Sequence, residues 1–135
     1  MILIINTADN KRVFIGLFDK GKLVAKKQFQ ARYRQAEKLL PQINRLLESR
    51  SHRLKDIKGI AVVNGPGPFT ALRIGVATAN TLAWALKTPI AGIKLSEFKN
   101  IDDLVEVSEV KIKKARPGHI ISPFYGQKPN ITLRK

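Results

Sequence analysis

Hydrophobic and polar positions in the first thirty residues follow the pattern of three successive strands. Apolar residues dominate residues 2–7, 12–18 and 23–29, and polar residues separate these runs. The second break, residues 19–22, reads Asp-Lys-Gly-Lys and has the composition of a tight turn. The chain is therefore predicted to open as an antiparallel meander.

Beyond the meander the spacing of apolar residues changes to a helical period and then alternates between the two kinds. Residues 33–49 have helical spacing, and Pro41 inside them predicts a kink or a later helix start. Residues 57–64, 70–86 and 89–94 predict a strand, a helix and a strand. The whole order predicts an α/β fold with a five-stranded mixed sheet flanked by helices.

The turn between the fourth strand and the second helix is the most informative stretch. It alternates glycine and proline at Gly65, Pro66, Gly67 and Pro68. Glycine reaches backbone angles closed to other residues, and proline fixes φ, so the turn is predicted to be stiff. Thr70 is predicted to cap the helix that follows. A dinucleotide fingerprint and a P-loop are both excluded here, because neither sequence is complete.

The second predicted helix carries small residues on one side. Ala71, Gly75, Ala79 and Ala83 recur every four residues and would form a shallow groove. Two interpretations stay open, because the groove could pack on the chain's own sheet or receive a helix of a partner. For the second interpretation, the predicted partner interface consists of Phe69, Thr70, Arg73, Ile74, Gly75, Ala77, Asn80, Thr81 and Trp84.

The charge of the chain favours a polyanionic partner, and the alternative interpretation is a basic surface that only keeps a small protein in solution. Twenty-five Lys and Arg against ten Asp and Glu give a net charge of +15 for 135 residues. Residues 111–135 hold seven basic and no acidic side chains. Phe124 and Tyr125, the aromatic residues of this tail, are expected to dock against the core. The candidate RNA contacts are Lys111, Lys113, Lys114 and Arg116.

Composition also limits the chemistry that the chain can carry. There is no cysteine, so disulfides and thiolate chemistry are excluded. His52 and His119 stand far apart without metal-ligand spacing, so no metal and no cofactor is predicted. The apolar start is too short for a signal peptide and no apolar run approaches about 20 residues, so a soluble cytoplasmic protein is expected.

A resemblance to a known family rests on residues 65–75. They read Gly-Pro-Gly-Pro-Phe-Thr-Ala-Leu-Arg-Ile-Gly and resemble the Gly-Pro-Gly-Ser-Phe-Thr-Gly-Leu-Arg-Ile-Gly signature of the TsaB (YeaZ) family. Pro68 and Ala71 are the two departures. Segments at 2–8, 36–43, 88–93 and 123–132 are similar to the family's first strand, first helix, next strand and closing segment, in that order.

The resemblance implies a single lobe of the actin-like ATPase (ribonuclease H-like) fold. Residues 1–98 would be the family's N-terminal lobe, and residues 99–135 would be a reduced linker and basic tail in place of the usual second domain. Asn6 stands where the family usually has an aspartate that helps to hold metal and phosphates. A neutral amide is a poorer ligand for a hard cation, so the chain alone is not expected to hydrolyse ATP.

The resemblance also implies the function and the partners. TsaB proteins are non-catalytic subunits that pair with the homologous catalytic subunit TsaD, which modifies certain tRNAs with a threonylcarbamoyl group, and the ATPase TsaE completes the system. The chain is therefore predicted to be a non-catalytic scaffold for a TsaD-like subunit, with tRNA bound through the complex and a TsaE-like ATPase and a homodimer as further assemblies. A free-standing RNA-binding module and a degenerate phosphotransferase completed by self-association are the alternatives.

Overall fold

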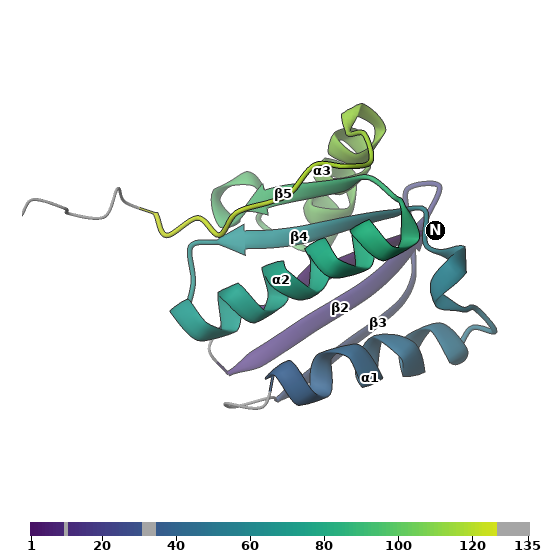
Figure 1. Cartoon of the computed structure of the whole chain (residues 1–135), viewed down its shortest axis with the longest axis horizontal. Coiled ribbons are helices and arrows are strands. Elements are labelled where there is room, and N and C mark those ends of the chain that lie inside the picture. The colour runs from purple at the N-terminus through teal and green to yellow at the C-terminus, as the bar shows by residue number, and fades with distance from the viewer. Residues whose placement is uncertain (10, 31–34, 127–135) are drawn as a thin grey trace, which may run out of the picture.

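A five-stranded mixed sheet forms the centre of the protein in a computed structural model that describes residues 1–9, 11–30 and 35–126 (Figure 1). The strands are β1 (Ile2–Asn6), β2 (Arg12–Asp19), β3 (Lys22–Gln30), β4 (Gly59–Gly65) and β5 (Ile90–Lys94). Their order in the sheet is β3-β2-β1-β4-β5. The pairs β1–β2 and β2–β3 are antiparallel, and the pairs β1–β4 and β4–β5 are parallel.

Helices cover both faces of this sheet. α1 (Gln35–Glu48) and α2 (Phe69–Leu86) lie on one face, and α3 (Ile101–Lys114) lies on the other (Figure 1). Two short 3₁₀ turns, Leu54–Asp56 and Leu95–Glu97, precede β4 and α3. In the described part of the chain no helix is both long and apolar enough to cross a bilayer.

The alternation of side chains along the central strands builds two hydrophobic clusters. Leu3 and Ile5 on β1 join Ile60 and Val62 on β4 in the cluster under α1 and α2. Ile4, between them, belongs to the cluster that α3 completes with Leu104 and Val105. Because successive strand side chains point to opposite faces, a central strand that is buried on both faces reads as a continuous apolar run.

The predicted fold class is confirmed, and each predicted strand and helix is present with ends that differ by at most two residues among those described. α1 continues through Pro41 rather than starting beyond it. The expected start of this helix at Tyr33, like residues 127–135 of the basic tail, lies outside the described residues. The sequence pattern predicted no element for residues 99–116, where the structure has α3.

Residues 115–126, which we call the strap, return from α3 across the face of the sheet that carries α2. The strap follows β5 (yellow-green in Figure 1), and Ile121 packs on the same cluster as α2. A side chain at Gly92 in β5 would come within 2.9 Å of Ile121 Cγ2. The strap therefore covers the part of the sheet that α1 and α2 leave bare.

Candidate partner interface

The glycine-proline turn owes its sequence to two close approaches of the backbone. Gly65 has φ +133°, and a Cβ there would overlap the carbonyl oxygen of Phe124 in the strap. Gly67 has no positive φ, but a Cβ there would lie 2.6 Å from the carbonyl oxygen of Ala8. The first glycine is therefore required by backbone angle and space, and the second by space alone.

The start of α2 differs from the prediction. The helix begins at Phe69, and its N-cap is Pro68, which makes no capping hydrogen bond through its side chain. Thr70 is therefore inside the first turn, and its predicted role as N-cap is wrong. The helix starts one residue earlier than predicted, and the Pro68 carbonyl accepts from the Leu72 backbone N–H at 2.9 Å.

The small-residue side of α2 faces the chain's own sheet. Ala71 and Ala83 are each 4% exposed and Ala79 is fully buried. Gly75 lies against the fully buried Thr7 at the end of β1, and a Cβ at Gly75 would overlap the Thr7 side chain. The groove therefore serves the internal packing of the lobe, and the prediction that placed Gly75 at a partner interface is corrected.

The opposite side of α2 is exposed along its whole length. Phe69, Arg73, Ala77 and Thr81 follow one another at four-residue spacing, and we call these four residues the α2 stripe. Thr70 is exposed beside the stripe, and Trp84, 82% exposed, lies at its end. Ile74 is different, because it is half-buried and packs on the cluster under α1 and α2.

An aromatic cluster joins the start of the stripe to the strap. Tyr125 stacks on Phe69 with ring centroids 4.6 Å apart, and the Arg73 guanidinium lies 3.8 Å from the centroid of the Phe69 ring. Arg73 Nε also donates to the Tyr125 hydroxyl at 3.0 Å. Phe124 lies under the Lys94 ammonium at 4.3 Å. Both aromatic residues fold back on the protein, but neither joins a hydrophobic core cluster, and Tyr125 is 38% exposed on the surface of α2. The expectation that Phe124 and Tyr125 dock against the core is therefore corrected.

Two asparagines hold the strap through its backbone. Asn80 Nδ2 donates to the Ile121 carbonyl at 2.8 Å, and its Oδ1 accepts from the Ile121 N–H at 2.9 Å. Asn64 Nδ2 donates to the Ser122 carbonyl at 3.0 Å, and the Asn64 carbonyl accepts from the Phe124 N–H at 2.7 Å. Asn80 therefore holds the strap and is not available to a partner as the sequence predicted. The spacing of residues along α2 could not show this contact, because Ile121 is distant in sequence.

Replacing Asn80 by aspartate is expected to release the strap, because a carboxylate facing the Ile121 carbonyl can no longer donate to it. Removing one partner of such a hydrogen bond costs about 1–3 kcal/mol. The expected result is faster proteolytic cleavage within residues 115–126, read by mass spectrometry. Thr81→Ala, on the exposed side of the same turn, should leave the cleavage rate unchanged. Equal rates for Asn80→Asp and the wild type would contradict this role of Asn80.

The four candidate RNA contacts do not share one environment. Lys111 Nζ donates to the Gly92 carbonyl at 3.0 Å and lies 2.7 Å from each Glu97 carboxylate oxygen, so Lys111 supports β5 and its predicted RNA contact is corrected. Lys113 is exposed and lies 4.0 Å from Glu109. Lys114 and Arg116 are exposed.

Glu97 is expected to make the stability of the chain depend on pH. Burial alone would raise the pKa of this carboxyl group, but the hydrogen bonds from Lys111 and from the Lys94 N–H outweigh burial, and the pKa is lowered. A lowered pKa contributes stability above the unfolded value, and this contribution is lost as the pH falls through the folded value. At pH 7 the wild type should have a higher melting temperature than the Glu97→Gln variant. This difference in melting temperature should disappear well below about pH 4, where Glu97 is protonated. Thermal melts at both pH values test this, and a constant difference would contradict it.

At the end of β1, Asn6 is used for a local turn. Its Oδ1 accepts from the Ala8 N–H at 2.9 Å, and it lines a shallow pocket with Ala8, Asp9, Pro68 and Leu95. This is the position at which the family resemblance would place an aspartate. The amide of Asn6 thus has a structural partner of its own.

Comparisons with known proteins agree with this architecture. A family model described as TsaD, tRNA N6-adenosine threonylcarbamoyltransferase, matches residues 29–98. The tRNA threonylcarbamoyladenosine biosynthesis protein TsaB of Bacillus subtilis (strain 168) is 30% identical over 135 residues, which are 96% of this chain and 57% of that protein. A tRNA N6-adenosine threonylcarbamoyltransferase of Vesicomyosocius okutanii is 36% identical over 75 residues, or 56% of this chain and 22% of that protein.

The structural comparison leads to the same group of proteins. YeaZ from Pseudomonas aeruginosa superposes with a TM-score of 0.63 at 27% identity, covering 69% of this chain and 43% of YeaZ. A lower-identity likeness to RuvC of T. thermophilus, with a TM-score of 0.52 and 11% identity, concerns the fold alone. The chain spans 57% of the length of the Bacillus TsaB protein. On the matched residues, the relatives and the shared actin-like fold, the chain belongs to the TsaB (YeaZ) family.

Proposed function

We propose that this chain is a docking subunit in the biosynthesis of threonylcarbamoyladenosine in tRNA, and that it binds a TsaD-like catalytic subunit through the α2 stripe. The support from relatives is that they are named for this biosynthesis and that the matching family model is named for the transferase. The proposed role is non-catalytic. The chain would position and stabilise its partner, with tRNA bound by the complex.

The observation that carries the proposal is the division of α2 into two sides. One side is fully occupied by packing of Gly75 and Ala79 on the sheet. The other side presents Arg73, Ala77 and Thr81 to solvent over three successive turns. An exposed helix side centred on an alanine lets a partner helix approach closely at that position, and arginine and aromatic residues at its edge are the types that most often anchor interfaces.

The strap enlarges this surface. Tyr125 lies on Phe69 and bonds Arg73, so the N-terminal end of the stripe is a rigid aromatic and cationic platform. An ordered side chain loses less conformational entropy when a partner covers it than a mobile one does. We therefore include Tyr125 in the proposed docking surface, together with Phe69 and Thr70 at the beginning of α2.

Size-exclusion chromatography of the purified chain with the TsaD-like subunit of the same organism tests the proposal. Mixed at micromolar concentration, the two proteins are expected to elute together ahead of either one alone. Separate elution at these concentrations would contradict the proposal. A TsaE-like ATPase and a homodimer of the free chain remain predictions, and the same columns run with each addition would test them.

A further inference from the structure

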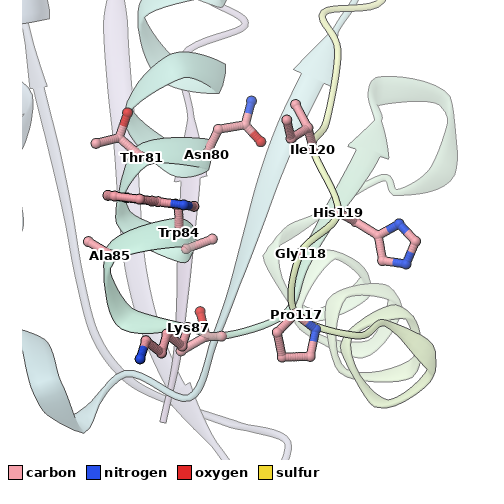
Figure 2. A pocket seen from close by; sticks show the side chains of 11 residues that line it. Asn80, Thr81, Trp84, Ala85, Lys87, Pro117, Gly118, His119 and Ile120 are labelled. Atoms are coloured by element: carbon pink, nitrogen blue, oxygen red, sulfur yellow. The ribbon is translucent and has the colours of Figure 1, made fainter.

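A pocket of about 790 Å³ opens between the last turns of α2 and the strap (Figure 2). Trp84 and Ala85 border it on the helix side, and Pro117 and Ile120 border it on the strap side (Figure 2). Trp84 is 82% exposed and Ile120 is 79% exposed. The pocket therefore combines an open indole ring with an aliphatic side chain from a segment that is distant in sequence.

The pocket lies in strongly basic surroundings. Lys87 lines its rim, and Arg116 immediately precedes Pro117 at its far side. Lys114 ends α3 just before the strap and is exposed. None of the described residues that line the pocket is Asp or Glu. The electrostatic potential of this region therefore favours an anionic occupant.

The shape of the pocket is fixed by the same hydrogen bonds that hold the strap. Ile121, next to Ile120, is bonded at both its N–H and its carbonyl by Asn80, which also lines the pocket. The apolar wall is thus held at a set position relative to α2. A site that is formed in advance does not need to order its walls when a ligand binds.

We propose that this pocket binds an unpaired nucleotide of single-stranded RNA. The base would stack on the Trp84 indole, and Lys87, Lys114 and Arg116 would bind the adjoining phosphates. An aromatic platform bordered by cations is the general means by which proteins hold single-stranded nucleic acid. An apolar side chain of a protein partner would explain the exposure of Trp84 and Ile120, but a phosphate chain also matches the series of cations and the net charge of +15.

This inference goes beyond the proposed docking function and concerns an adjoining surface, which shares Thr81 with the α2 stripe. Ala77, at the centre of the α2 stripe, precedes Trp84 by about two helical turns. The two proposals also have different readouts, because RNA binding is measured on the isolated chain and docking is measured with the TsaD-like subunit. Either one can fail while the other stands.

The single tryptophan of the chain gives a direct test. A single-stranded oligoadenylate of about eight nucleotides, within the usual site size for such contacts, is titrated into the full chain while the Trp84 emission is followed. Saturable quenching is expected. Heparin, a polyanion without bases, should bind without quenching. RNA binding with unchanged Trp84 emission, or no RNA binding at low salt, would overturn the proposal.

Variants then separate stacking from charge. Trp84→Ala is expected to weaken oligoadenylate binding by roughly 5- to 150-fold, measured by fluorescence polarisation of labelled RNA, and Trp84→Phe should restore most of it. Arg116→Ala should reduce the slope of log K against log salt concentration by about one, the value for a single phosphate contact. Lys26→Ala on β3, at the opposite edge of the sheet, should leave this slope unchanged. Trp84→Ala binding as tightly as the wild type would overturn the proposal. The same holds if Trp84 emission responds to the TsaD-like subunit and not to RNA.

Discussion

Gly75→Ala is expected to destabilise the protein by about 3 kcal/mol, although the same change in an exposed helix normally stabilises by up to about 1 kcal/mol. The sign is reversed because the added methyl group has no space. It would overlap Thr7 Oγ1 and lie 2.8 Å from Thr7 Cγ2, and Thr7 is fully buried at the end of β1. Thermal and urea unfolding of the purified variants measure the effect.

Two further variants make this result specific. Ala77→Gly, on the exposed side of the same helix, should cost about 1 kcal/mol through propensity alone. Thr7→Ala removes the two nearest atoms, so the double variant Gly75→Ala/Thr7→Ala should recover part of the loss, the Thr7 Cβ still lying 3.0 Å from the new methyl group. Gly75→Ala with wild-type stability would show that α2 does not pack on Thr7 as described.

Ala77→Arg is expected to weaken binding of the TsaD-like subunit by at least about 100-fold, since it places a long charged side chain at the centre of the proposed docking surface. The free chain should fold and melt normally, because Ala77 is exposed. Isothermal titration calorimetry with the purified partner gives the dissociation constants, and circular dichroism confirms the fold of the variant.

The matched control for Ala77→Arg is Val110→Arg. Val110 is 49% exposed on α3, which lies across the sheet from α2. The control adds the same side chain and charge to the other face, so it should leave the affinity within about threefold of the wild type. Equal loss of binding in both variants would point to charge and not to the surface, and undiminished binding of Ala77→Arg would exclude the stripe as the docking site.

Much of the fold was predictable because it depends on local patterns. The continuous apolar runs of β1 and β4 predict strands, and the glycine-proline turn locates the start of α2 to within two residues. α3 was missed because its apolar positions are interleaved with Asp102, Asp103 and a basic last turn, so that on its own it resembles a solvated segment. Its Leu104 and Val105 are buried only because they pack on the sheet, which the local sequence does not show.

The candidate interface was less predictable, because the local sequence of α2 predicts a helix but does not show which side of the helix packs on the sheet. The spacing of Ala71, Gly75 and Ala79 identified a groove, but which partner fills a groove depends on the tertiary structure. Lys111 and Asn80 show the same limit. Each is a residue type that is common on surfaces, and each donates a hydrogen bond to a backbone carbonyl that is distant in sequence. Tyr125 at the start of the stripe had one signal, the aromatic pair that it forms with Phe124 in an otherwise basic tail.

The strap also has a consequence for the order in which the protein matures. Its anchoring contacts join residues 41 and 58 positions apart, and the strap follows every strand and helix among the residues that the structure describes. The strands are synthesised before the strap, so Gly92 and the neighbouring part of β5 stay uncovered until the strap docks on them. Chaperones that recognise exposed apolar strands would therefore meet this protein at β5, in the interval before Ile121 arrives.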